Sequence, residues 1–443
     1  MTYPEKIDTL LEADWIVPVE PAGTVLRHHA IAIDEGIIKA IAPGEQARAQ
    51  FNPREHITLD QHVLIPGLVN LHTHAAMSLM RGLADDLPLM EWLNKHIWPA
   101  ENRHVDTNFV FDGTRLACAE MLQGGITCFN DMYFYPGAAA EAALTTGIRA
   151  SIGMIVIDFP SAYASDTDDY LTKGLAVRDK YRQHPRLSFC FAPHAPYTVN
   201  DKAFAKILTY AEQLNLPIHI HLHETLDEIR IGLETTGIRP IERLQQLDLL
   251  SPNLIGVHMV HLTDREISLM SQQGCSVAHC PSSNLKLANG LAPVAEMLNQ
   301  GINVGLGTDS AASNNRLDML EEMRIAALLA KTQSGHAHAL TAHQALHMAT
   351  LAGARALGLD QIIGSLVVGK AADITALDFS NINLTPCYDL ISHLVYTVGR
   401  EHVNHVWVDG KMLLKDKQLT TLDTTELHHR ATFWQQRIGT TGN

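Results

Sequence analysis

The segment Pro217-Ile218-His219-Ile220-His221-Leu222-His223-Glu224 gives the strongest indication of how this chain folds. Residues two apart in a β-strand point to the same face, so the three histidines share one face of an apolar strand. Buried polar side chains need partners, which makes a plain surface strand a poor explanation. If that face lines the inside of a barrel, a polar site lies there. Glu224 follows the strand and would lie in a loop at its carboxyl end, where barrel enzymes hold their catalytic groups.

Three other apolar segments also end in possible metal ligands. They are Leu71-His72-Thr73-His74, Gly256-Val257-His258 and Val304-Gly305-Leu306-Gly307-Thr308-Asp309. His72 and His74 can reach one cation from one strand end, and zinc is bound by imidazole nitrogen and carboxylate oxygen. Each pattern alone is weak, since a single His-x-His pair proves little and Asp309 could cap a following helix. Four such strand ends together predict a metal centre, although alternation alone does not decide which histidine of the 217–224 segment takes part.

Apolar strand-like segments alternate with helical segments between residues 64 and 357. The candidate strands are Leu64–Leu71, Ile126–Asn130, Ala150–Val156, Leu187–Ala192, Ile218–Leu222, Leu254–Val257, Ser276–Ala278 and Val304–Gly307. Helices are expected between them, for example at Asp201–Leu214 and Leu317–Ala330. Eight such units predict an α/β fold of the (β/α)₈ TIM-barrel type. An open doubly wound sheet is the alternative, but its G-x-G-x-x-G signature is missing.

Both ends of the chain have β-hairpin patterns. Residues 30–33 and 37–41 flank the turn Asp34-Glu35-Gly36, and Val403–Val408 is followed by Asp409-Gly410 and a returning apolar segment. We therefore expect a small composite β-sandwich domain built from the two ends. The predicted boundaries are residues 1–62 and 363–443 for its two parts and 63–362 for the barrel.

The composition restricts the partners and the compartment. The chain has 443 residues, of which 46% are hydrophobic, as in a globular protein with a large core. Its 33 basic and 48 acidic residues give a formal net charge of -15, which would repel nucleic acid. The six cysteines form no C-x-x-C pair, which indicates free thiols in a reducing compartment. Neither a secretory signal nor a membrane-spanning apolar run is visible, so we expect a cytoplasmic homo-oligomer with no membrane partner.

The order and context of these histidines and the aspartate resemble the amidohydrolase superfamily. Three segments, at residues 75–101, 281–287 and 307–309, further resemble the 5-methylthioadenosine/S-adenosylhomocysteine deaminases, and the resemblance covers nearly the whole chain, including residues 364–373, which in the superfamily re-enter the small β domain. The resemblance implies a set of four metal ligands, His72, His74, His221 and Asp309. It selects His221 because the family has a glutamate three residues after this ligand. Relatives with two metals use a lysine on the fourth strand, and the segment Phe189–His194 has none, which implies one divalent metal per chain, with zinc preferred.

The same resemblance assigns roles in the hydrolytic deamination of an adenine nucleoside to an inosine-type product and ammonia. Glu224 is implied as the proton shuttle, and His258 as the group that steadies the attacking hydroxide or the tetrahedral centre. Asp309 is implied to take a proton from water besides binding the metal. Glu101 matches the position that accepts hydrogen bonds from ribose hydroxyls, and His194 a position that contacts the base. The implied substrates are 5'-methylthioadenosine, adenosine or S-adenosylhomocysteine.

One departure from the family pattern and two alternatives bear on this hypothesis. A carboxylate-bearing substrate such as S-adenosylhomocysteine needs a cation, but Lys173, Arg178 and Lys180 fall in no motif that matches the family. Methylthioadenosine or adenosine is therefore favoured. Within the superfamily, guanine deaminases and s-triazine hydrolases share the metal pattern. A non-catalytic zinc-binding scaffold is the alternative of another class, although a structural zinc would not need Glu224. Asn284 is expected to shape the pocket wall rather than to take part in chemistry.

Overall fold

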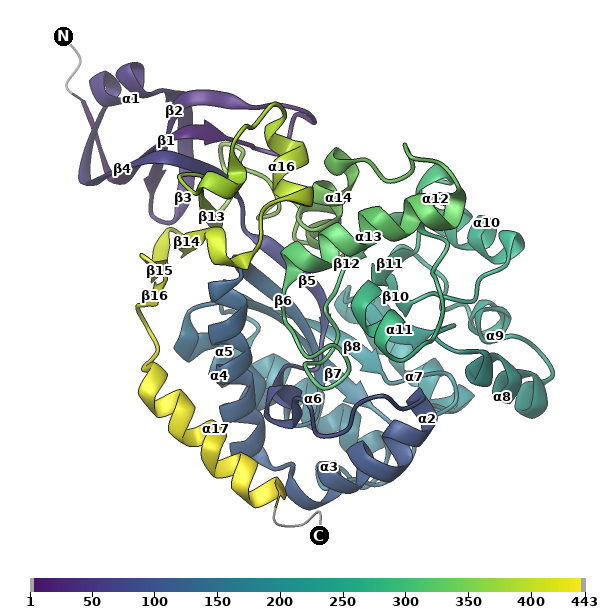
Figure 1. Ribbon diagram of the computed structural model, residues 1–443. Helices are drawn as coiled ribbons and strands as arrows, with labels where there is room; N and C mark the ends of the chain where they lie inside the picture. Colours follow the sequence, from purple (N-terminus) through teal and green to yellow (C-terminus); the bar gives the residue numbers. More distant parts are fainter. Residues whose placement is uncertain (1–3, 440–443) are drawn as a thin grey trace.

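The computed structural model describes residues 4–439, and its centre is a barrel of eight strands (Figure 1). Neighbouring strands are parallel and follow the order β12-β11-β10-β9-β8-β7-β6-β5. The strands are β5 (Leu68–Thr73), β6 (Ile126–Tyr133), β7 (Arg149–Val156), β8 (Leu187–Pro193), β9 (Ile218–Leu222), β10 (Leu254–His258), β11 (Ser276–His279) and β12 (Asn303–Leu306). The predicted barrel fold is confirmed.

The first and last strands close the barrel through bonds just beyond β12. The Asp309 amide donates to the His72 carbonyl at 3.0 Å, and the Thr308 amide donates to Asn70 Oδ1 at 2.9 Å. Asn70 in turn donates to the Thr308 hydroxyl at 2.8 Å. The segments around His72 and Asp309 are thereby held side by side, although they lie more than two hundred residues apart.

Helices cover the outside of the barrel and connect its strands (Figure 1). They are α4 (Thr107–Gln123), α5 (Pro136–Thr146), α6 (Thr167–Tyr181), α7 (Asp201–Leu214), α8 (Leu226–Thr236), α9 (Pro240–Gln246), α10 (Asp264–Gln272), α11 (Pro281–Lys286), α12 (Val294–Asn299), α13 (Met319–Ser334), α14 (Ala342–Met348) and α15 (Leu351–Ala356). The predicted helix Asp201–Leu214 is confirmed at both ends. It begins there because Asn200 caps it, accepting a hydrogen bond from the Ala203 amide. The helix predicted at 317–330 begins two residues later, since Asp318 is its N-cap.

Short helices cover the carboxyl end of β5, and one long helix packs against the outside of α4. The short helices are η1 (Ala75–Met80), α2 (Leu89–Trp92), η2 (Leu93–Ile97) and α3 (Trp98–His104). The long helix α17 (Thr424–Gly439) is attached through buried Asp112 of α4, which accepts hydrogen bonds from Arg430 and Trp434. None of the helices within residues 4–439 is long and apolar enough to cross a membrane.

The second sheet combines both ends of the chain, in the order β16-β15-β14-β13-β4-β1-β2-β3. Its strands are β1 (Glu5–Ile16), β2 (Leu26–Asp34), β3 (Ile37–Pro43), β4 (Phe51–Pro66), β13 (Ile374–Asp378), β14 (Val403–Val408), β15 (Lys411–Lys415) and β16 (Gln418–Leu419). It is accompanied by α1 (Gly44–Gln50), η3 (Ile382–Leu384), α16 (Leu390–Tyr396) and η4 (Arg400–His402). Both predicted hairpins, β2–β3 and β14–β15, are confirmed.

The strand predicted at Leu64–Leu71 is wrong as a single element. Residues up to Pro66 belong to β4 and pair with β13, whereas β5 begins at Leu68. The chain passes from one sheet to the other at Gly67, where a Cβ atom would lie 2.0 Å from the Thr127 hydroxyl. The continuous apolar composition hides this change, because both halves are buried.

Candidate metal centre and active site

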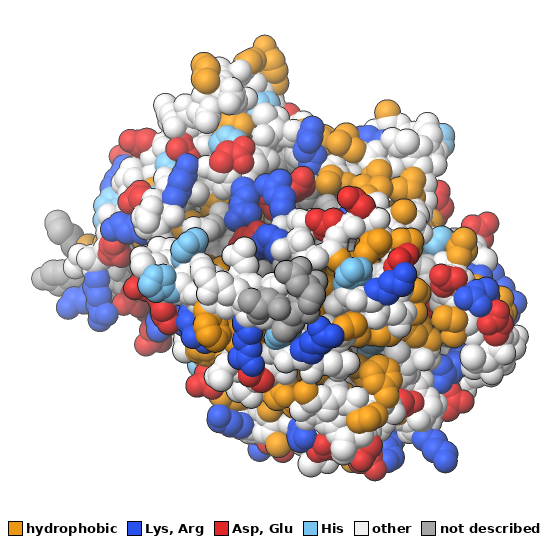
Figure 2. All heavy atoms as spheres, turned by 60° about the horizontal axis from the view of Figure 1, so that its bottom comes forward, with side chains coloured by type: hydrophobic (Ala, Val, Ile, Leu, Met, Phe, Trp, Pro, Cys, Tyr) orange, Lys and Arg blue, Asp and Glu red, His pale blue; other side chains and the backbone are white. Residues whose placement is uncertain are grey.

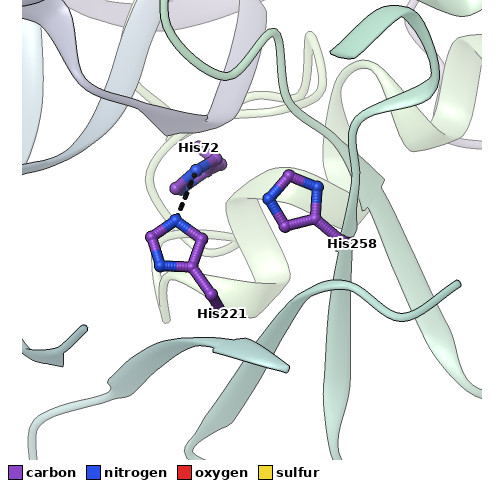
Figure 3. A group of neighbouring side chains, drawn as sticks. All are labelled: His72, His221 and His258. Carbon is purple, nitrogen blue, oxygen red and sulfur yellow. Dashed lines mark hydrogen bonds between the residues drawn. The ribbon is translucent and has the colours of Figure 1, made fainter. Parts of the chain in front are cut away.

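The predicted metal ligands converge at the carboxyl end of the barrel. His221 Nε2 lies 3.3 Å from Nε2 of His72 and 3.3 Å from Nε2 of His74. Asp309 Oδ1 lies 3.3 Å from His72 Nε2 and 3.4 Å from His74 Nε2. Ligands about 2.0–2.2 Å from a tetrahedral zinc ion are about 3.3–3.5 Å from one another, so these separations fit one such ion. His258 Nε2 faces the same point from β10 (Figure 3).

The hydrogen bonds behind two of these imidazoles show where their protons lie. Nδ1 of His74 is 2.5 Å from the Met132 carbonyl, and Nδ1 of His221 is 2.7 Å from the His194 carbonyl. A carbonyl oxygen only accepts, so Nδ1 carries the proton and Nε2 presents a lone pair to the centre. Lone pairs converging at this distance repel one another unless a cation lies between them. The donor set therefore fits a divalent metal.

The electrostatics of the ligands agree with this fit. Burial lowers the pKa of His72 to about 4 and that of His221 well below its usual range, so both stay neutral at pH 7. Burial alone would raise the pKa of Asp309, but the neighbouring histidines, His72 foremost, hold that pKa well below its usual value. Its Oδ2 also accepts from the hydroxyls of Ser283 and Ser313, at 2.6 and 2.7 Å, which leaves Oδ1 facing the histidines.

The backbone is strained where the strands deliver their side chains. His223, His258 and Asp309 have φ values of 54°, 71° and 61°, in the left-handed region that residues with a side chain seldom adopt. Such outliers persist only where the surrounding structure enforces them, and they cluster at functional sites. Here they fall at or just beyond the ends of β9, β10 and β12.

Glu224 lies beside His258 at the edge of the metal centre. Its Oε1 is 3.8 Å from His258 Nε2 and accepts a hydrogen bond from Asn289 at 2.9 Å. Burial raises the pKa of Glu224 above its ordinary value, the direction expected for a carboxyl group that accepts and returns protons. The Glu224 amide donates to buried Glu228 at 2.9 Å, and His258 Nδ1 lies 2.9 Å from Asn284 Oδ1.

The three alternating histidines of β9 have three different environments. His221 joins the centre, whereas His219 lies behind His72, with 3.1 Å between His219 Nε2 and His72 Nδ1. The His223 side chain points away from the metal centre and forms hydrogen bonds with the backbone. Its Nδ1 faces the His261 carbonyl at 3.1 Å, and its Nε2 accepts from the Ile241 amide at 3.1 Å. The structure thus distinguishes residues that the alternation leaves equivalent.

The predicted substrate-binding residues line the same cavity as the metal centre. Glu101 on α3 accepts a 2.7 Å hydrogen bond from the Tyr133 hydroxyl, and burial raises the Glu101 pKa to about 7. His194 follows β8, and its Nδ1 lies 3.0 Å from the Thr198 hydroxyl. Burial lowers the pKa of His194 to about 3, so the imidazole is neutral. One cavity therefore contains a carboxyl group, a neutral imidazole and the metal-binding set.

One part of the cavity lining, here called the outer wall, is aromatic. It is formed by Trp92, Trp98, Phe134, Tyr135, Phe159 and Tyr163. Within residues 4–439, no lysine or arginine lines the cavity. Lys173 of α6 is nearby but committed, donating to the Tyr163 carbonyl at 2.6 Å and to Asp169 at 2.8 Å. The outer wall thus offers no cation to a substrate carboxylate.

Several supporting residues were missed from the sequence. Asn284 was expected only to shape the wall, yet it contacts His258, and the adjacent Ser283 holds Asp309. The motif at 281–287 was the available signal for this pair. Ser313, Asn289 and Glu228 carried no comparable signal, since single polar residues in loops are common.

The comparisons with known proteins cover nearly the whole chain. The amidohydrolase family model matches residues 63–413. A 5-methylthioadenosine/S-adenosylhomocysteine deaminase of Saccharophagus degradans is 49% identical, over 99% of this chain and 98% of that protein. The structure of an adenosine deaminase from Xanthomonas campestris with bound zinc is 46% identical, with a TM-score of 0.98 over 99% of this chain and 100% of that one. An atrazine chlorohydrolase of Arthrobacter aurescens, 23% identical with a TM-score of 0.89 over 96% of this chain and 99% of that one, shares the fold.

Proposed function

The chain belongs to the amidohydrolase family and is a hydrolase acting on C–N bonds; from this premise we propose that it deaminates an adenine nucleoside with the help of a bound metal. The products would be the inosine-type nucleoside and ammonia. One observation carries the proposal. A single cavity contains a buried carboxyl group, Glu224, beside converging imidazole nitrogens, and a second, half-buried carboxyl group, Glu101. Glu224 and the imidazoles suit hydrolysis, and Glu101 suits a substrate rich in hydroxyl donors.

His72, His74, His221 and Asp309 are proposed to hold one divalent ion, with zinc preferred. The separations of their ligand atoms and the zinc bound in the Xanthomonas relative support this choice. When bound, such an ion activates water as a nucleophile at neutral pH. The chain's own part is twofold: burial keeps His72 and His221 neutral, and the hydroxyls of Ser283 and Ser313 donate to Asp309 and favour its ionised form.

Glu224 is proposed to move the protons. Deamination adds water across the double bond between the ring nitrogen and the carbon that bears the amino group, then breaks the bond from that carbon to the amino group and releases ammonia. A proton must leave the water, and protons must reach the ring nitrogen and the departing amine. Glu224 has the raised pKa that this exchange needs, and the Asn289 amide orients it. His258, oriented by Asn284, is proposed to stabilise the charge that develops on the attacking oxygen. Asp309 is proposed to assist by accepting the water proton.

The substrate is proposed to bind with its ribose on Glu101 and its base beside His194. Two hydroxyl donors of the ribose match a carboxylate whose second oxygen stays available after Tyr133 has bonded the first. The aromatic outer wall then receives the 5' substituent. Among the described residues, no lysine or arginine lines that wall, so the amino-acid carboxylate of S-adenosylhomocysteine would leave water without gaining a cationic partner. Methylthioadenosine and adenosine are therefore proposed to be better substrates than S-adenosylhomocysteine.

An absorbance assay with a panel of substrates tests the proposal. The panel contains adenosine, methylthioadenosine, S-adenosylhomocysteine, adenine, guanine and an s-triazine, each with and without a chelator. We expect chelator-sensitive turnover of the first two, weaker turnover of S-adenosylhomocysteine, and poor turnover of adenine. Faster turnover of guanine or a triazine would replace the proposed reaction with that one. No turnover by a zinc-loaded protein would favour a non-catalytic scaffold.

A further inference from the structure

The proposed function leaves both His219 and His223 of the 217–224 segment without a role, and His219 is the one that contacts a proposed metal ligand. It is completely buried, and its ring meets the His72 ring edge-on, with 5.0 Å between centroids and 67° between planes. Its Nε2 lies 3.1 Å from His72 Nδ1. Its Nδ1 is buried and has no hydrogen-bond partner among the residues that the structure describes. A buried polar atom without a partner is uncommon and calls for an explanation.

His72 differs from the other histidine ligands in what lies behind it. Nδ1 of His74 and of His221 each faces a main-chain carbonyl, which fixes the proton on Nδ1 whatever side chains surround it. Nδ1 of His72 instead faces another imidazole. Either ring nitrogen of a neutral histidine can be the donor, so the two facing nitrogens share one proton, and its position is not determined by His72 alone.

A metal bound to Nε2 of His72 would determine which of the two facing nitrogens carries the shared proton. A metal on His72 Nε2 needs a lone pair there, which places the proton of His72 on Nδ1. His219 Nε2 must then accept that proton in a hydrogen bond, and the proton of His219 must lie on its own Nδ1. This is the atom without a partner. The missing partner of His219 Nδ1 is thus explained, because Nε2 of His219 serves as the acceptor for His72.

Resting on the proposed metal-dependent function, we propose that His219 is a positioning residue that orients His72 and keeps its Nε2 available to the metal. Without an acceptor at this place, His72 can rotate or move its proton to Nε2, which then points an N–H group at the ion. Partners behind a ligating histidine typically change metal affinity about 10–100-fold when they are removed. His72 is the one histidine of the proposed ligand set whose described Nδ1 partner is a side chain, so this partner can be changed by substitution.

The test measures zinc affinity by competition with a chromophoric chelator, using the full-length protein without substrate. His219→Phe removes the acceptor and keeps an aromatic ring, whereas His219→Gln keeps an acceptor. His223→Gln is the control just beyond the end of the same strand, because buried His223 contacts the His261 carbonyl, the Ile241 amide and the side chains of Arg239 and Glu266 and lies outside the proposed ligand set. We expect His219→Phe to weaken zinc binding about 10–100-fold, with His219→Gln and the control within a few-fold of wild type. Wild-type affinity in a folded His219→Phe variant would overturn the proposal.

A second measurement keeps the proposal testable if His219→Phe does not fold. Two-bond proton–nitrogen spectra of the wild-type protein with ¹⁵N-labelled histidines report which ring nitrogen carries the proton. We expect a protonated Nδ1 on both His72 and His219 in the zinc-loaded protein. An unprotonated Nδ1 on His72 would overturn the proposal. A wild-type protein that binds zinc yet deaminates no nucleoside would refute the proposed function alone, because neither measurement involves turnover.

Discussion

The inner and outer halves of the cavity are built on different principles. The inner site, formed by His72, His74, His221, His258 and Asp309, comes from strand ends, and its polar atoms are paired with carbonyls, hydroxyls and neighbouring rings. The outer wall comes from the short helices after β5 and from loops after β6 and β7, and its side chains are mostly aromatic. An inner site of this kind tolerates few changes, because each substitution leaves a buried partner unpaired. The outer wall can change its shape without this penalty, so substrate choice can vary separately from chemistry.

The molecular surface adds a third environment. On the face drawn in Figure 2, basic side chains are interspersed with acidic ones rather than gathered into one basic surface. Nucleic-acid binding depends on grouped positive charge. The arrangement on that face, with a net charge of -15, suits a small-molecule substrate better than a polyanion.

The largest effect is expected within the inner half, where substitution of a metal ligand and of the proposed proton shuttle should have different consequences. Glu224→Gln removes a proton-exchanging group, so we expect turnover to fall by about 10²–10⁴-fold. Zinc content should stay near wild type, because Glu224 is not one of the proposed ligands. His221→Ala should lose zinc and activity together. Steady-state kinetics and elemental analysis of both variants provide the measurement.

Two outcomes would change these assignments. If Glu224→Gln loses its metal as readily as His221→Ala, Glu224 becomes a ligand and the set must be redrawn. If Glu224→Gln keeps wild-type turnover, the shuttle is another group, with His258 and Asp309 as the remaining candidates.

The two halves also differ in how well the sequence predicts them. Local patterns predict where the inner site lies, since alternation places His72 with His74 and apolar strands end at or near candidate ligands, whereas the choice of His221 depends on the family resemblance. The role of His219 does not follow, because the ring it contacts lies 147 positions earlier in the chain. The partners of Asp309 and Glu224 come from loops, where sequence carries no periodicity. The strand break at Gly67 was missed for another reason, because both neighbouring strands are buried and apolar.

A smaller effect is expected where the two halves meet, at Glu101. Glu101→Ala removes the proposed acceptor for the ribose hydroxyls. Hydrogen bonds to a charged group contribute about 1.5–3 kcal/mol, so we expect kcat/KM for adenosine to fall by roughly 10–10²-fold. The control substrate is 2',3'-dideoxyadenosine, which lacks both hydroxyls and should be equally poor with either protein. A parallel loss for both substrates would indicate a general disturbance of the cavity instead of a lost ribose contact.

The smallest effect is expected from Tyr133→Phe and appears mainly as a change in pH dependence. Burial raises the pKa of Glu101 to about 7, while the hydrogen bond from Tyr133 favours the ionised form and lowers it. The ionised carboxylate is the better acceptor, so the wild-type KM for adenosine should fall as pH rises through about 7. Removing the Tyr133 hydroxyl raises the Glu101 pKa further. The fall in KM should then move to higher pH, with a several-fold larger KM at pH 7 and a nearly unchanged kcat.

KM measured from pH 6 to 9 for both proteins tests this prediction, with dideoxyadenosine as the control substrate whose KM does not depend on Glu101. A shift to lower pH, or the same shift with dideoxyadenosine, would show that Tyr133 acts on the cavity by packing and not through the ribose-binding carboxylate.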